Sequence, residues 1–99
     1  MASPNERARR KQLRDAYKSA ERAARSALLP INRSQLATLV EFVDAQVLAD
    51  GCDHTPRHGK RWAYEQGISW EALGEGLRQL GGWCDCEIVM NCHPEEVFR

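Results

Sequence analysis

The sequence predicts a mainly helical protein: a long N-terminal helix, then a small three-helix body that ends in a short extended C-terminal segment and is stapled by one metal ion. Three observations support this fold class. Good helix formers dominate residues 5–29, leucine and valine recur at helical spacing further along, and two short cysteine clusters flank the last two body helices. The 99 residues suit one small domain, whose modest core would gain from such a staple.

Residues 5–29 are predicted to form one helix because no glycine or proline interrupts them. At about 100° per residue, one face is rich in alanine and the opposite face is basic. The basic face carries Arg7, Lys11, Arg14, Lys18, Arg22 and Arg25. Residues 1–30 have a net charge of +5 and residues 31–99 one of −5. We therefore divide the chain into a basic helical arm, residues 1–30, and a small metal-stabilised helical domain, residues 31–99.

The break at Pro30 is followed by the expected main core helix. Ser34 is the predicted N-cap, and Gly51 is predicted just past the end of the helix near residues 49–50. The apolar residues of its inward face recur at helical spacing and are Leu36, Leu39, Val40, Val43 and Val47. This helix is therefore expected to supply the centre of the core.

The next body helix is predicted to begin at the Thr55–Pro56 pair, with Thr55 as N-cap and Pro56 as the first helical residue. It is expected to run to about Gln66 and to stop at Gly67. Gly59 weakens this prediction, because a glycine inside a helix costs about 1 kcal/mol relative to alanine.

Ser69 is expected to cap the last body helix, in which large apolar residues recur at helical spacing before the Gly81–Gly82 pair. These residues are Trp70, Leu73, Leu77 and Leu80. Residues 83–91 are predicted to be extended, and Pro94 is predicted to begin one short helical turn.

Two cysteine clusters predict a metal site. Cys52 and His54 form one pair at i and i+2, and Cys84 and Cys86 form the other. Residues two apart project from the same side of an extended backbone, so each pair can act as one jaw around an ion. The resulting Cys3His set suits structural, tetrahedral Zn²⁺, although the spacing does not separate zinc from iron. His58 is an alternative fourth ligand, whereas Cys92 and His93 are expected outside the site.

The competing interpretation is a set of buried free cysteines, with His54 bonded to backbone at a helix start. The charged residues among the ligands are open to two interpretations as well. They could orient His54 or neutralise nearby Arg57 and Lys60, or they could be ordinary solvated acids. These carboxylates belong to Asp53, Asp85 and Glu87.

The paired motifs resemble those of an uncharacterised family of small bacterial proteins known only as a domain of unknown function. Its marks are Cys-Asp-His-Thr followed by arginine, and Gly-Gly-aromatic-Cys-Asp-Cys-Glu. They correspond here to residues 52–55 with Arg57, and to residues 81–87. The C-terminal residues and the basic, alanine-rich start look similar too, while Pro56 and Gly59 depart from the pattern. The resemblance implies no particular activity.

We expect a cytoplasmic, zinc-stabilised binding module whose basic helix contacts RNA through its phosphate backbone. No apolar run approaches the roughly 20 residues of a membrane span, and no secretory signal opens the chain. One alternative is a protein-interaction module or homodimer that uses the N-terminal helix on an acidic surface, and another is a helix that is merely solvated. An enzyme with thiol-redox or zinc chemistry is the least expected, because no nucleotide loop or H-E-x-x-H motif is present.

The tryptophans Trp62, Trp70 and Trp83 occur near helix ends and beside the second cysteine cluster. We expect them to pack around the metal site, to screen the thiolates from water, and to find hydrogen-bond partners for their N–H groups.

Overall fold

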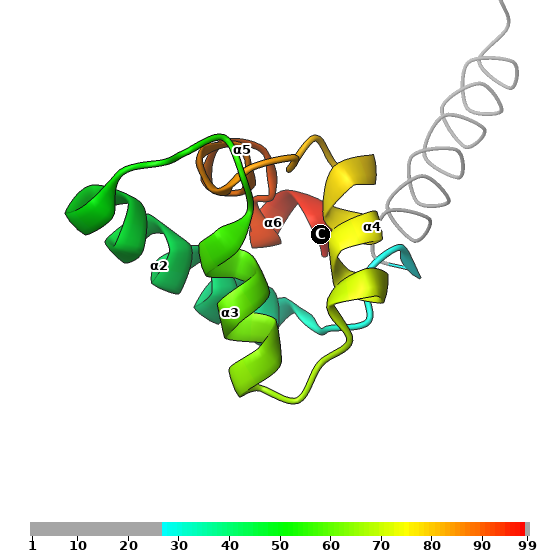
Figure 1. Ribbon diagram of the computed structural model, residues 1–99. Helices are drawn as coiled ribbons and strands as arrows, with labels where there is room; N and C mark the ends of the chain where they lie inside the picture. Colours follow the sequence, from blue (N-terminus) through cyan, green and yellow to red (C-terminus); the bar gives the residue numbers. More distant parts are fainter. Residues whose placement is uncertain (1–26, 99) are drawn as a thin grey trace, which may run out of the picture.

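The computed structural model describes residues 27–98, and in this part the chain is entirely helical, with five helices and no strand. The basic residues of the predicted arm, Arg7 to Arg25, lie outside the described residues. None of the described helices combines the length and the apolar character needed to cross a bilayer. The helices are α2 (Arg33–Asp50), α3 (Arg57–Glu65), α4 (Trp70–Gln79), α5 (Asp85–Asn91) and α6 (Pro94–Val97) (Figure 1).

The N-cap of helix α2 lies two residues before the predicted one. Asn32, not Ser34, is the N-cap, and it forms a capping box with Gln35. The Asn32 side chain accepts from the Gln35 backbone N–H at 2.8 Å, and the Gln35 side chain accepts from the Asn32 N–H at 2.8 Å. Two amides that the helix leaves free are thereby satisfied. The predicted end is confirmed, since Gly51 follows with φ 76°.

Helix α3 begins one residue later than predicted, because Pro56 is the N-cap and not the first helical residue. Thr55 is not the cap either, since its hydroxyl and backbone N–H donate to the Asp53 carboxylate. No side chain next to this helix start supplies a cap. The predicted end is close to the observed one, with Gln66 as C-cap and Gly67 at φ 69°.

Helix α4 has the predicted N-cap, because the Ser69 hydroxyl accepts from the backbone N–H of Ala72 at 3.5 Å. One glycine on this helix allows an unusually close approach of the preceding chain. A Cβ on Gly76 would lie 2.3 Å from the carbonyl oxygen of Leu28 and 2.8 Å from a methyl of Leu29. The segment before α2 therefore packs directly on the backbone of α4.

The extended segment predicted over residues 83–91 is wrong, because residues 85–91 form helix α5. Only its start is extended, at the N-cap Cys84 (φ −137°, ψ 173°). Acidic residues in the first turn, Asp85 and Glu87, favour the positive end of a helix dipole. The short apolar run that follows fits a strand or a helix equally well by periodicity. The predicted turn at Pro94 is confirmed as helix α6.

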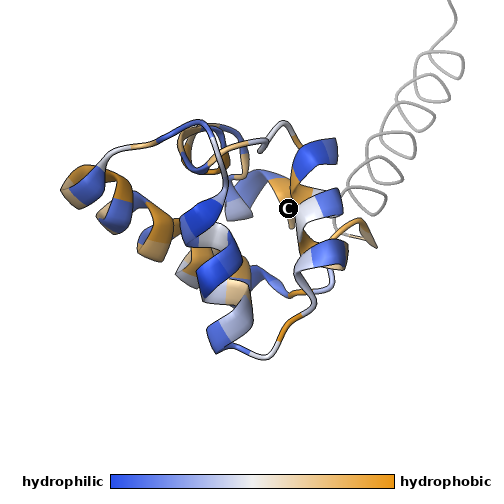
Figure 2. Cartoon of the chain, viewed as in Figure 1, coloured by the Kyte–Doolittle hydropathy of each residue, from blue (hydrophilic) through white to orange (hydrophobic). Residues whose placement is uncertain are grey.

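Helix α2 lies at the centre of the described fold, where it contacts α3, α5 and α6, and α3 in turn contacts α4. Figure 2 shows hydrophobic and hydrophilic residues interspersed along α2 and α4, as expected for helices with one buried face. The predicted core residues of α2 and α4 are buried or half-buried, whereas Leu48 near the end of α2 is exposed. The apolar residues that are fully buried in the core are Leu36, Leu39, Val43, Ala63, Leu73, Leu77, Ile88 and Cys92.

Candidate metal centre

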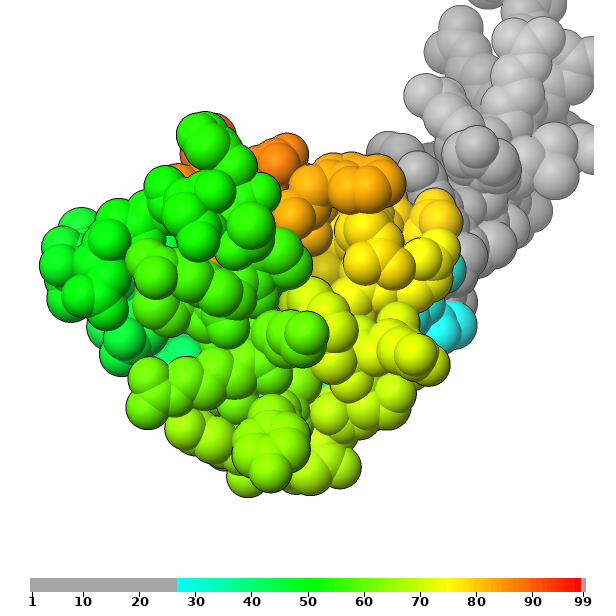
Figure 3. Space-filling view, in the orientation of Figure 1, coloured from blue at the N-terminus to red at the C-terminus, as the bar shows by residue number. Residues whose placement is uncertain are grey.

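The two segments that carry the predicted ligands pack against each other, because the backbone N–H of Asp85 donates to the carbonyl of Thr55. Cys52 lies in the loop after α2, and Cys84 and Cys86 lie at the start of α5. The Cys52 sulfur interacts with the side chains of both Cys84 and Cys86. Figure 3 shows the orange surface around the start of α5 between the green of α2 and α3 and the yellow of α4. Residues more than 30 positions apart in the sequence thus form one cysteine cluster, Cys52, Cys84 and Cys86.

Asp85 aligns the two halves of this cluster. Its side chain is completely buried, and its two carboxylate oxygens accept from the backbone N–H groups of His58 and Gly59, each at 3.1 Å. Its own backbone N–H donates to the carbonyl of Thr55 at 3.3 Å. Asp85 therefore supplies the N-terminal cap that α3 lacks locally, and it fixes α5 against the loop that contains Cys52.

The acidic residues between the ligands have distinct roles. Asp85 binds backbone amides in place of the expected contacts with His54, Arg57 or Lys60. Asp53 is exposed and forms an ion pair with Arg57 at 3.6 Å, as one of the interpretations predicted. A hydrogen bond from the Thr55 hydroxyl lowers the pKa of Asp53, and this bond closes the turn after Cys52.

Glu87 is the third acid, and it contacts a predicted ligand directly. The Cys84 thiol donates to the Glu87 carboxylate at 3.6 Å. Spacing alone could have suggested this contact, because residues 84 and 87 are neighbours on the first turn of a helix. The expectation of an extended segment concealed it.

The three thiols differ in their surroundings. The backbone N–H of Cys86, near the start of α5, lowers the pKa of Cys52. Burial raises the pKa of Cys84, and the neighbouring Cys52 acts in the same direction. The interaction with the Cys52 side chain raises the pKa of Cys86 to about 11.

The histidines do not complete the cluster as it stands. His54 has an exposed side chain and a left-handed backbone (φ 69°), and its backbone N–H faces the Cys52 sulfur. The alternative ligand His58 is buried, and its Nε2 has no hydrogen-bond partner among the described residues. Across residues 27–98, no group of three or more histidine, cysteine or acidic side chains is already arranged to hold a metal ion.

The donor chemistry nevertheless suits Zn²⁺, because all four cysteines of the chain are free thiols and three of them lie in the two segments that Asp85 joins. Cys92, expected outside the site, lies elsewhere: it is fully buried in the core, and burial raises its pKa to about 11. His93 is half-buried at the N-cap of α6.

The expected packing of the tryptophans around the site is wrong in two respects. Trp83 is 62% exposed, and its ring lies beneath the Arg78 guanidinium at 5.9 Å. Trp62 is buried as expected, but its indole N–H has no partner among the described residues. Trp70 packs against the core and contacts Gly59 on α3.

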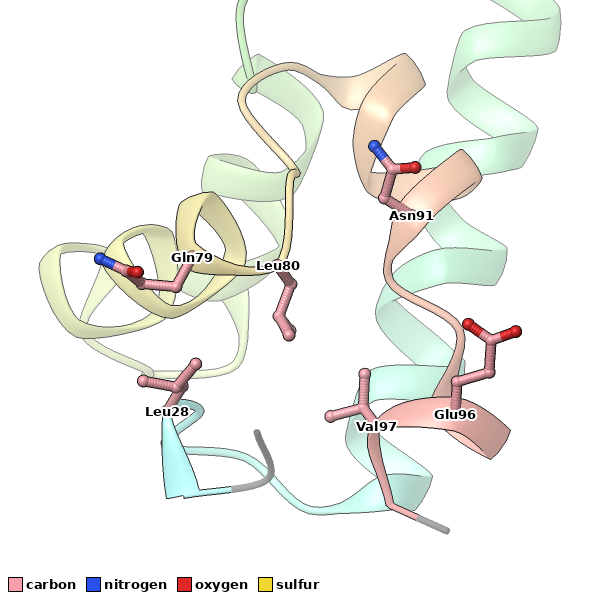
Figure 4. Close-up of a pocket in the computed structure, with 6 residues that line it drawn as sticks. All are labelled: Leu28, Gln79, Leu80, Asn91, Glu96 and Val97. Atoms are coloured by element: carbon pink, nitrogen blue, oxygen red, sulfur yellow. The ribbon is translucent and has the colours of Figure 1, made fainter. Parts of the chain in front are cut away.

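A cavity of about 310 Å³ opens on a different part of the fold. In Figure 4 the side chains of Leu28, Leu80 and Val97 point towards one another across it. Gln79, Asn91 and Glu96 complete its lining. The cavity shares no residue with the cysteine cluster.

The described fold and the cysteine cluster define a small helical protein with a thiol-rich centre. The chain belongs to the family described as Protein of unknown function (DUF2695), which matches residues 39–91 and so includes both cysteine motifs. It is 55% identical over 98 residues to uncharacterised proteins of Mycobacterium bovis and Mycobacterium tuberculosis, and the similarity covers 99% of each chain. No solved structure matches it.

Proposed function

We propose that this protein is a small, intracellular, zinc-stabilised helical binding module. In this proposal Cys52, His54, Cys84 and Cys86 hold a structural Zn²⁺, and the basic helix of residues 1–30 contacts RNA. The observation that carries the proposal is the packing of the two cysteine-bearing segments against each other through Asp85, which binds Thr55, His58 and Gly59. Thiolates are preferred ligands of structural zinc, and four protein ligands close such a site.

A metal at this position would stabilise the fold in a specific way. The polypeptide between Cys52 and Cys84 contains α3 and α4, so an ion held by both clusters would close that two-helix loop. Structural zinc contributes about 10 kcal/mol or more in small zinc domains, a large amount for a core of this size. Free thiols that remain reduced also fit the expected cytoplasmic setting.

His54 supports the proposal as the fourth ligand because of its position. It follows Cys52 by two residues on an exposed loop, and its side chain is free to reorient. Arg57 and Asp53 tie the same loop to α3 through their ion pair. The buried imidazole of His58 is the alternative donor, since its Nε2 lacks a partner in the described part of the chain.

The metal proposal is tested by the zinc content of full-length protein purified without added metal, measured by elemental analysis. We expect about one zinc per chain, and a thermal melt at lower temperature after chelation. Cys52→Ala and Cys86→Ala should remove the metal, and the matched control Cys92→Ala should keep it, because Cys92 lies in the core. His54→Ala and His58→Ala identify the imidazole ligand. Absence of bound metal, or a melt indifferent to chelator, would contradict the proposal.

The RNA proposal rests on the charge of the arm. Six basic residues recur on one face of the predicted helix, whereas the rest of the chain is acidic. The affinity of the full chain for a structured RNA should fall steeply between about 50 and 200 mM salt, as phosphate contacts require. Replacing Arg14, Lys18 and Arg22 by glutamine should weaken binding, and the matched replacement of Arg33, Lys60 and Arg61 should not. Self-association without RNA binding in sedimentation would favour the protein-interaction alternative.

A further inference from the structure

The cavity of about 310 Å³ lies apart from the cysteine cluster and has no part in the proposed function. Its walls come from stretches that are distant in the sequence: the segment before α2, the end of α4, and α5 with α6. Figure 4 shows Leu28 and Leu80 on one side of it, and Asn91, Glu96 and Val97 on the opposite side. Small-molecule sites begin at about 300 Å³, so this volume suits a ligand of few atoms.

The inner part of the cavity is apolar. Val97 is buried and Leu80 is half-buried, so both side chains belong to the edge of the core. Leu28 points towards them from the other side and is 42% exposed. A short alkyl chain placed among these three side chains would be removed from water and would cover part of Leu28, and both changes favour binding.

The polar groups of the cavity present acceptors to a ligand. The Asn91 amide nitrogen donates to the Gly81 carbonyl at 2.9 Å, and the Gln79 amide nitrogen donates to the Glu75 carboxylate at 3.2 Å. Neither of these two acceptors lines the cavity, so the two amide nitrogens serve contacts outside it. The Asn91 carbonyl oxygen and the Glu96 carboxylate, which belong to the same wall, remain to accept from a ligand.

The wall that carries these acceptors is held in place by its own contacts. Gly81 has φ 93°, and a Cβ on it would lie 3.2 Å from the Asn91 amide nitrogen, so a side chain at this position would crowd the hydrogen bond. The backbone N–H groups of Glu96 and Val97 both donate to the His93 carbonyl at 3.0 Å. The acceptors are therefore positioned before a ligand binds, which lowers the entropic cost of binding.

Glu96 determines the charge of a suitable ligand. Of the six residues that line the cavity, it alone carries a charge. The ion pairs within residues 27–98 are formed by other residues, Arg57–Asp53, Arg61–Glu65 and Arg78–Glu75. A cationic group would be attracted to the carboxylate, whereas an anionic group would be repelled. An ammonium group also offers three N–H donors and no acceptor, which matches a carboxylate and an amide oxygen.

We propose that this cavity binds a short primary alkylammonium ion. The alkyl chain lies among Leu28, Leu80 and Val97, and the ammonium group donates to the Glu96 carboxylate and the Asn91 carbonyl oxygen. The occupant is a free small molecule, because the cavity is at the lower end of the volumes of small-molecule sites and its apolar and acceptor groups face one another across it. The site requires neither zinc nor RNA.

The test titrates isotope-labelled full-length protein with n-pentylamine at neutral pH and records NMR spectra. We expect saturable amide shifts at Asn91, Glu96 and Val97, with a Kd on the order of 1 mM for a ligand of this size. Nuclear Overhauser contacts should join the alkyl chain to the methyl groups of Leu28, Leu80 and Val97. The uncharged n-pentanol should bind more weakly, and pentanoate should not bind. No saturable shift, or contacts only with the exposed Leu48, would overturn the proposal.

Two neighbouring residues of α6 provide a matched pair of variants. Glu95 and Glu96 are both exposed, but only Glu96 lines the cavity. Glu96→Gln should weaken n-pentylamine binding about two- to fivefold, as expected for a solvated ion pair, and Glu95→Gln should leave it unchanged. Equal losses would show a response to overall charge and would overturn the site. Tighter binding of a lysine blocked at both its amino and carboxyl groups than of n-pentylamine would contradict a free small-molecule occupant.

Discussion

Asp85 holds Gly59, 26 residues away along the chain, through a 3.1 Å hydrogen bond from the Gly59 backbone N–H to a buried carboxylate oxygen. The second carboxylate oxygen accepts from His58 at the same distance. Because Asp85 lies between Cys84 and Cys86, the residue that caps α3 also fixes the position of these two cysteines relative to α3. The cysteine cluster is thus part of the tertiary packing of α3 against α5.

We predict that Asp85→Ala lowers the free energy of unfolding by about 2–3 kcal/mol, because two amides at the start of α3 lose a charged acceptor. Asp85→Asn keeps one acceptor oxygen and should lose less. Urea unfolding of the chelated protein measures both changes. Asp44→Ala, at an exposed position of α2, is the control and should be near neutral. Equal stabilities for the Asp85 and Asp44 variants would contradict the assigned role.

We predict a loss of stability at alkaline pH that depends on Cys92. Burial raises its folded-state pKa from 9.0 to about 11, so the unfolded chain releases the proton first. Stability from this group is therefore complete below pH 9 and is lost as the pH rises towards 11, by up to about 2 kcal/mol. Cys92→Ala should show a flatter dependence over this range in urea unfolding. If the free energy of unfolding depended on pH in the same way for the unmodified protein and for Cys92→Ala, the effect would be excluded.

We predict that Gly76→Ala destabilises the protein by about 1–3 kcal/mol although alanine is the better helix former. The added Cβ would meet the Leu28 carbonyl oxygen, a backbone atom that cannot move without displacing residues 27–31. Gly74→Ala is the comparison, since its Cβ would meet only the Trp70 ring at 3.0 Å. Thermal unfolding should give Gly74→Ala a higher melting temperature than Gly76→Ala. The reverse order would show that the contact with Leu28 is not close.

We predict opposite consequences for two tryptophans. Trp62→Ala should cost about 3–5 kcal/mol, because the indole is 3% exposed and its removal leaves a cavity. Trp83→Ala should cost less than about 1 kcal/mol, because the ring is exposed and contributes mainly its contact with Arg78. Chemical denaturation of both variants provides the measurement. A large loss for Trp83→Ala would indicate that this ring packs on the fold.

Local signals in the sequence predicted α2, α4 and α6 well. The apolar spacing of Leu36, Leu39 and Val43 and the caps at Gly51 and Ser69 depend on neighbouring residues, which a sequence displays directly. The start of α3 could not be predicted in the same way, because its cap is Asp85, which is distant in the sequence. Gly59 looked unfavourable because the local sequence shows only its low helix propensity. Its advantage depends on distant residues, since the missing side chain leaves the space that Ile88 and Trp70 occupy beside it.

The pairing of the cysteines as metal ligands stays a prediction, and the extended backbone assumed for one pair is wrong. Cys84 and Cys86 were paired on the assumption of an extended backbone, and they instead lie at the cap and first turn of α5. Both residues still lie at the end of α5 that faces the loop after α2, because the backbone N–H of Asp85 between them donates to the carbonyl of Thr55. The exposure of His54 could not be read from the sequence, since it follows from a left-handed backbone in the loop.

Because Asp85 binds the start of α3, the fluorescence of Trp62 on that helix can report on changes near Asp85. Trp62 is buried on the same short helix whose first amides bind Asp85. A change at the neighbouring sulfurs that displaces this carboxylate would shift α3 and alter the apolar surroundings of the indole. Intrinsic fluorescence of Trp62, read in a chain that carries phenylalanine in place of the other two tryptophans, would then follow the chemical state of the thiols without any attached dye.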